Sequence, residues 1–135
     1  MTIQWDDKLL TGIEEIDNQH MEMFDSIKDI LNACNAKKGR EESIKIFAFL
    51  EDYIIKHFKS EESIMLNYVY PYRLSHLAEH DQFKSVVSEL RNELKDSGPT
   101  GQFVIKLNRK LVQWLISHIC KEDKKLAEHI RNKKK

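Results

Sequence analysis

Proline and glycine constrain this chain most, because only two prolines and four glycines occur in its 135 residues. The internal interruptions fall at Gly39, at Pro71 and in residues 97–101, which read Ser-Gly-Pro-Thr-Gly. Both residue types end or weaken helices, and the long segments between them carry apolar residues at spacings of three and four. This pattern predicts four long helices, over residues 17–38, 41–65, 71–95 and 102–125.

Each expected helix has one apolar face, as a helix does when it packs against others. The inward face of the third comprises His76, His80, Phe83, Val87, Leu90 and Leu94. Short connections between long helices force neighbours to run in opposite directions. We therefore predict an all-α fold, an antiparallel up-down-up-down four-helix bundle.

A length of 135 residues suits one domain with a single core. We expect residues 1–16 to form an extended amino-terminal arm, after which Asp17 or Asn18 caps the first helix. Residues 126–135 are rich in lysine, and we expect a basic, solvated tail there. His129 is expected to be exposed in that tail.

Charged residues make up 33% of the chain and balance to a formal net charge of zero, so nothing indicates a nucleic-acid surface. No segment approaches the roughly 18 apolar residues that a membrane span needs, and the amino terminus does not resemble a secretory signal. Cys34 and Cys120 stand alone, as free thiols do in a reducing compartment. We expect a cytoplasmic protein and take it to be a monomer.

Polar residues interrupt the apolar faces near the start of the first and third helices and near the end of the second and fourth. Taken helix by helix, they are His20; His57 and Glu61; His76 and His80; and His118 and Asp123. In an up-down-up-down bundle these four places share one level. The sequence thus predicts a layer of five histidines and two carboxylates inside the core.

A bound metal explains such a layer most simply. One histidine on an apolar face is usually a hydrogen-bonded core residue, but seven polar groups buried without a cation would cost several kcal/mol for each unpaired group. His57 and Glu61 stand four residues apart, as do His76 and His80, so each pair shares one face of its helix. Asp123 follows His118 by five residues, so we expect a π-type turn or a distorted helix end between them.

The number of ligands favours two metals over one. Five imidazoles, two bridging carboxylates and a bridging oxygen would fill all but one of the positions around two six-coordinate metals. A structural zinc takes about four ligands, often including cysteine, and seven converging groups would overfill it. Imidazole with some carboxylate suits iron, with zinc or manganese as alternatives.

The same residues stand in four runs, which are Gly12-Ile13-Glu14-Glu15-Ile16-Asp17-Asn18-Gln19-His20, His57-Phe58-Lys59-Ser60-Glu61-Glu62, His76-x-x-x-His80 and His118-Ile119-x-x-x-Asp123. In this order and at these separations they closely resemble the hemerythrins, in particular the stand-alone bacterial ones, over essentially the entire chain. A single motif is weak, but the ordered set is highly specific.

The resemblance implies a hemerythrin-like bundle that binds dioxygen reversibly at two irons joined by an Fe-O-Fe or Fe-OH-Fe bridge, and no enzymatic activity. By matched position, three histidines would bind the filled iron, two histidines the iron with the open position, and two carboxylates would bridge both. These groups are, in that order, His76, His80 and His118; His20 and His57; and Glu61 and Asp123. Glu62 is interpreted as a surface or outer-shell group.

A protein pocket must keep water from the bound oxygen, and five residues near the ligands are candidates for its lining. They are Trp114, Leu115, Phe24, Phe58 and Ile119, each of which core packing would explain equally well. Trp5 is given a packing role only. Five neutral imidazoles against two carboxylates favour reversible binding over cleavage of the O–O bond.

Other functions stay open beside the oxygen carrier or store. They are an oxygen or redox sensor that acts through a partner, a reductase of peroxide or nitric oxide, and an iron store. A histidine phosphotransfer bundle would need one exposed histidine rather than several buried ones.

Overall fold

The computed structural model describes residues 5–134, and every regular element in that range is helical. The elements are the short helix η1 (Asp7–Leu9), α1 (Glu14–Asn35), α2 (Arg40–Asn67), α3 (Arg73–Ser97), α4 (Gly101–Lys106), η2 (Leu107–Val112), α5 (Gln113–His118), η3 (Ile119–Asp123) and α6 (Lys124–Lys134). The last five follow one another without a break, and η2 and η3 are π-helical. They form the fourth rod of the bundle.

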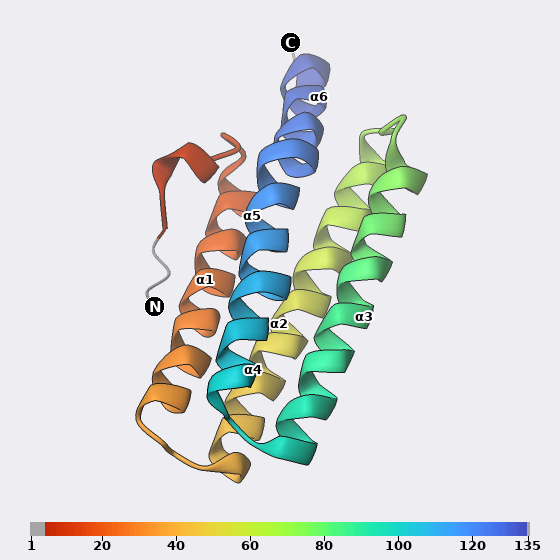
Figure 1. Ribbon diagram of the computed structural model, residues 1–135. Helices are drawn as coiled ribbons and strands as arrows, with labels where there is room; N and C mark the ends of the chain where they lie inside the picture. The colour runs from red at the N-terminus through yellow and green to blue at the C-terminus, as the bar shows by residue number, and fades with distance from the viewer. Residues whose placement is uncertain (1–4, 135) are drawn as a thin grey trace.

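The four rods run alternately down and up, and both turns at the lower end are short (Figure 1). This arrangement confirms the predicted all-α, antiparallel four-helix bundle. It brings the start of α1, the end of α2, the start of α3 and the α5–η3 region to the upper end of the bundle. No helix within residues 5–134 is long and apolar enough to cross a membrane.

The first helix begins three residues earlier than predicted, and neither Asp17 nor Asn18 is its cap. Asp17 lies inside α1 with a buried carboxylate, which accepts hydrogen bonds from the backbone N–H and hydroxyl of Thr11, both at 2.8 Å, and from the N–H of Gly12 at 3.1 Å. Asp17 therefore fixes the loop before the helix. Of the expected arm, residues 1–4 lie outside the described residues.

The turn between α2 and α3 lies two residues later than predicted, because α2 continues to Asn67 and α3 begins only at Arg73. Pro71 lies in this turn rather than in the first helical turn. Val69 has a φ of 50°, a left-handed conformation that is costly for a β-branched residue. The preceding α2 starts after Gly39, whose φ of 90° suits glycine.

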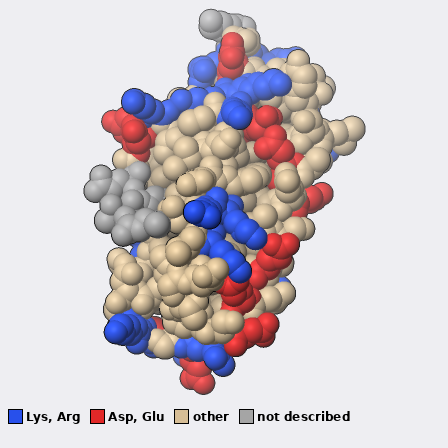
Figure 2. Space-filling model, in the orientation of Figure 1, with Lys and Arg blue, Asp and Glu red and all other residues tan. Residues whose placement is uncertain are grey.

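The expected basic tail is wrong, because residues 124–134 form helix α6. Leu126 and Ile130 are buried and pack with Ile16 and Met65, and Ala127 is buried as well. Lys125 and Lys133 of the same helix are exposed, so the segment is amphipathic although its composition is basic. Figure 2 shows positive side chains gathered at this end of the molecule.

His129 is partly buried in α6 rather than fully exposed, and its Nε2 lies 2.9 Å from the carbonyl oxygen of Tyr68. This contact ties α6 to the turn between α2 and α3. Cys34 is buried and Cys120 is exposed, and both are free thiols, as the sequence predicts. Burial raises the pKa of the Cys34 thiol.

Candidate metal centre

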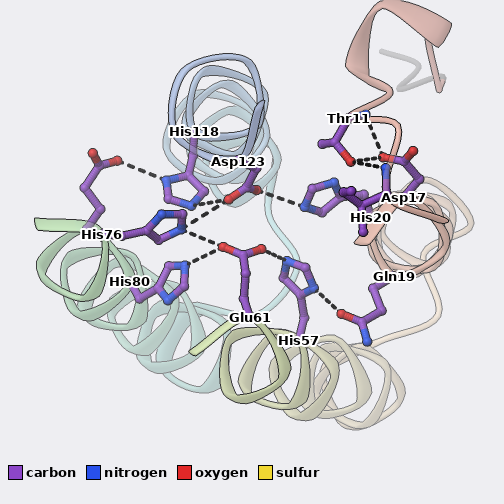
Figure 3. A network of polar contacts seen from close by, with 12 residues as sticks. Thr11, Asp17, Gln19, His20, His57, Glu61, His76, His80, His118 and Asp123 are labelled. Atoms are coloured by element: carbon purple, nitrogen blue, oxygen red, sulfur yellow. Dashed lines mark hydrogen bonds and ion pairs between the residues drawn. The ribbon is translucent and has the colours of Figure 1, made fainter. Parts of the chain in front are cut away.

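The seven polar residues predicted to converge do lie together, near the upper end of the bundle. All seven are at least 97% buried: His20, His57, Glu61, His76, His80, His118 and Asp123. Figure 3 shows Glu61 and Asp123 in the middle, with three histidines on one side and two on the other. Apolar clusters lie on both sides of this layer along the bundle axis.

The fourth rod places its two polar residues by means of a π-helical segment. Asp123 follows His118 by five residues, and the intervening Ile119–Asp123 form η3. Because π-helical bonding runs from i to i+5, it returns the fifth residue to the face of the first. The predicted π-type turn is confirmed, whereas the second π segment, Leu107–Val112, had no signal in the sequence.

Each carboxylate turns one oxygen toward each group of histidines. Glu61 Oε2 lies 2.9 Å from His57 Nε2, and Oε1 lies 2.6 Å from His76 Nε2 and 3.2 Å from His80 Nε2. Asp123 spans the other side of the layer in the same way.

Asp123 Oδ2 lies 2.9 Å from His20 Nε2, and Oδ1 lies 3.2 Å from the Nε2 atoms of both His76 and His118. Both carboxylates are thus shared between the two groups. A bridging ligand needs this placement, with one oxygen on each side.

The inward atoms have no hydrogen-bond partners despite these short distances. Both oxygens of Glu61 and Asp123, and the Nε2 atoms of His20, His76, His80 and His118, are buried and unpartnered among the described residues. Buried polar atoms of this kind are rare in proteins unless they bind something. Donor atoms that are close together but not aligned for hydrogen bonds fit an arrangement around a common cation.

Two overlapping sets of ligand atoms could each hold a metal ion, and within each set all atoms lie within 4.8 Å of one another. One set is Glu61, His76, His80, His118 and Asp123, and the other is His20, His57, Glu61 and Asp123. We call these the three-histidine group and the two-histidine group. Imidazole and carboxylate ligands without cysteine suit iron and similar divalent metals.

The histidines and carboxylates of the layer shift each other's pKa values. Burial lowers the pKa of His76, but contacts with Asp123 and Glu61 outweigh this effect and raise it to about 10. The pKa of His118 rises to about 9, because Asp123 and Glu61 likewise outweigh burial. The imidazoles of His76 and His118 can therefore bind protons that a metal ion would have to displace.

The carboxylates shift in the complementary direction. Burial raises the pKa of Glu61, as does the charge of Asp123, but contacts with His57 and His76 hold it well below its usual range. Burial also raises the pKa of Asp123, and the contact with His118 more than reverses this. Both carboxylates are thus ionised and available as ligands.

Three histidines have outer partners on Nδ1, which hold Nε2 toward the centre of the layer. His57 Nδ1 lies 2.7 Å from Gln19 Oε1, His80 Nδ1 lies 3.3 Å from Glu62 Oε2, and His118 Nδ1 lies 3.0 Å from Glu79 Oε1. Glu62 therefore has the outer-shell position that the sequence offered as one of two readings. Gln19 and Glu79 were missed, because nothing in their spacing shows that they contact histidines of other helices.

The pocket candidates lie against the ligands in different ways. Phe58 stacks on His80 with ring centroids 3.8 Å apart, and Trp114 stacks on His118 at 4.6 Å. Leu115 and Ile119 are buried in the same apolar cluster as Phe58. Phe24, in that cluster too, has Trp5 edge-on at 5.3 Å, which agrees with the packing role expected of Trp5.

Comparison with known protein families decides the relationship. The model of the hemerythrin HHE cation binding domain matches residues 11–130. The chain belongs to the hemerythrin family. The matched segment contains all seven residues of the layer.

Hemerythrin relatives match most of this chain. A bacteriohemerythrin of Pseudomonas aeruginosa is 31% identical over 95% of this chain and 81% of its own length. One from Methylococcus capsulatus is 32% identical over 84% of this chain and 85% of its own. A crystal structure of wild-type hemerythrin superimposes with a TM-score of 0.83 at 27% identity, covering 96% of this chain and 98% of the other.

Proposed function

We propose that this member of the hemerythrin family holds two iron ions in the layer and binds dioxygen reversibly, as an oxygen carrier, store or delivery protein. One observation carries the proposal: the two ligand groups share Glu61 and Asp123 but differ by one histidine. A metal in the two-histidine group would have one protein ligand fewer than its neighbour. That difference would leave a position for an exogenous ligand.

The ligands suit reversible binding better than oxidation of a substrate. Two ferrous ions, held by these residues, would supply the two electrons that dioxygen takes up on binding. Five neutral imidazoles and two carboxylates leave net positive charge on such a pair, so further oxidation is disfavoured. Ferritin-like di-iron sites, which use mostly glutamates, have a more anionic ligand shell.

The apolar side chains around the layer have a separate task, which is to exclude water. Phe58, Leu115 and Ile119 are each at most 2% exposed and lie in the cluster that adjoins the histidines. Phe24 and Trp114 extend this apolar wall. A dry surrounding disfavours proton entry and the loss of bound oxygen as a reduced product.

Optical spectroscopy of the reduced, iron-loaded protein tests the proposal. We expect about two irons per chain and an absorption band that appears with oxygen and disappears on degassing over repeated cycles. Rapid conversion to the ferric form with turnover of added peroxide or nitric oxide would instead indicate a reductase. A protein that takes up no transition metal on reconstitution would refute the proposal.

A pair of histidine variants sharpens the test. His20→Ala removes a ligand from the two-histidine group, so we expect iron content to fall toward one per chain and the oxygen band to be lost. His129→Ala is the matched control, because His129 lies outside the layer and contacts the Tyr68 carbonyl. Unchanged iron content and oxygen binding in His20→Ala would contradict the assignment.

A further inference from the structure

The two ligand groups differ in the charge of the residues behind them. In the three-histidine group, the Nδ1 atoms of His80 and His118 face the carboxylates of Glu62 and Glu79 at 3.3 and 3.0 Å. In the two-histidine group, His57 Nδ1 faces the neutral amide oxygen of Gln19 at 2.7 Å. Two negative charges therefore stand behind one group, and the only outer partner found behind the other, within the described residues, is uncharged.

The neutral partner is held in place by its own contacts. Gln19 Nε2 donates a hydrogen bond to Ser60 Oγ at 3.2 Å, and Ser60 donates to the Glu15 carboxylate at 3.2 Å. Because the amide nitrogen is engaged in this way, the amide oxygen is the atom turned toward His57. An amide that rotated freely would not orient the imidazole.

An anionic acceptor and a neutral one have different effects on a ligand. A carboxylate that accepts the Nδ1 proton makes the imidazole a more basic ligand through Nε2, and a charge-assisted hydrogen bond is roughly twice as strong as a neutral one. The imidazoles themselves are buried, whereas Glu62 and Glu79 are 30% and 34% exposed. Water weakens the carboxylates' influence without removing it.

We propose that Glu62 and Glu79 are positioning residues that make the metal of the three-histidine group the more easily oxidised of the two. Gln19 keeps the metal of the two-histidine group electron-poor. The inference rests on the proposed function insofar as it requires two irons. When an external one-electron donor such as a reduced viologen loses an electron to the oxidised pair, that electron goes to the two-histidine metal, and a second donor molecule reduces the three-histidine metal.

The test is a potentiometric titration, without oxygen, of the iron-loaded full chain and three variants. Glu79→Gln should make the second reduction step easier by about tenfold in its equilibrium constant, which is 59 mV for one electron. Glu62→Gln should act in the same direction but less, because its contact is longer. Gln19→Glu should make the first step harder, leaving the second little changed.

A matched control and a redox-independent readout separate this effect from structural damage. Glu89→Gln removes an equal charge from the same helix as Glu79, at an exposed site that pairs with Lys110, and should leave both potentials unchanged. Zinc affinity of the three-histidine group should fall about tenfold in Glu79→Gln and not in Glu89→Gln. A general loosening of the fold would shift both steps together and would lower the iron content.

The outcomes distinguish this inference from the proposed function. If the wild-type chain binds two irons and oxygen, but Glu79→Gln, Glu62→Gln and Gln19→Glu leave both potentials in place, the inference is overturned and the function stands. If the potentials shift as expected but no reversible oxygen band forms, the oxygen-binding function is overturned and the inference stands. A wild-type chain without bound metal would end both.

Discussion

The apolar part of the core and the polar layer are built on opposite principles. Toward the lower end of the bundle, Phe47 and Phe103 are fully buried with ring centroids 6.2 Å apart, in a cluster made only of apolar side chains. In the layer, both oxygens of Glu61 and Asp123 and the Nε2 atoms of four of the five histidines are buried without hydrogen-bond partners among the residues that the structure describes. The apolar part needs no ligand, whereas a bound cation would give the unpartnered atoms of the layer the contacts that they lack.

The free-energy consequences of this difference have opposite sign. Burying an apolar aromatic side chain stabilises the fold by roughly 1.5–3 kcal/mol, whether or not a metal is present. Burying an unpaired polar group costs free energy until something binds it. The folding of the chain should therefore depend on the apolar cluster, and its metal content on the layer.

The largest effect is expected from Phe47→Ala, which leaves a cavity in the apolar cluster. We expect a loss of about 3–5 kcal/mol in the free energy of unfolding, equal in the metal-free and metal-loaded protein. Urea unfolding followed by circular dichroism measures it. Phe49→Ala is the control, because Phe49 is 76% exposed on the same helix and should cost less than about 0.5 kcal/mol.

Glu61→Gln should have the opposite profile. The substitution keeps the shape of the side chain but removes the charge that both ligand groups share, so we expect metal affinity to fall by at least about a hundredfold. The metal-free fold should remain intact. Metal analysis after dialysis against a graded chelator gives the affinity, with the exposed Glu42→Gln on the same helix as control. Retention of two metals at wild-type affinity would show that Glu61 is not shared.

Proton competition in the layer predicts a pH dependence with a definite sign. The pKa values of His76 and His118, about 10 and 9, lie above the ordinary imidazole value of 6.5. Their contribution to the stability of the metal-free protein is fully present below that ordinary value and is lost as pH rises through the raised values. A metal must displace the same protons.

We therefore expect the apparent metal affinity to rise about tenfold per pH unit for each proton displaced, up to about pH 9. Over the range from about pH 7 to 10, the free energy of unfolding of the metal-free protein should fall. Chelator competition with zinc, followed from pH 6 to 9, measures the first effect. An affinity that stays flat over this range would mean that these imidazoles are already unprotonated.

The sequence predicts the layer well because its residues stand at positions set by helical periodicity. His57 and Glu61 are four residues apart, and their level follows from the alternation of the helices alone. Asp123 required one further inference, a π-type turn, because its spacing from His118 breaks the periodicity. These arguments use only spacings along the chain.

Contacts between different helices are not encoded in such spacings. The partners of His57 and His118, which are Gln19 and Glu79, come from helices whose rotation about their axes the sequence does not fix to within one side chain. In α6, the basic composition of the segment is typical of a solvated tail, and the four-residue spacing of Leu126 and Ile130 is the one sign of its buried face. Local periodicity thus predicts which face of a helix a residue lies on and its height along the bundle axis. It does not predict which side chain of another helix the residue contacts.

Asp17 offers the smallest and most selective test of the comparison between the core and the layer. It is a buried carboxylate three residues before His20, but its oxygens accept hydrogen bonds from Thr11 and Gly12. Like the apolar core, it therefore needs no metal. Asp17→Ala should cost about 1 kcal/mol in the free energy of unfolding, and equally with and without metal. Thermal unfolding of both forms, beside Asp25→Ala at an exposed position of α1, measures it. A loss of stability seen only in the metal-loaded protein would mean that Asp17 supports metal binding and belongs to the layer.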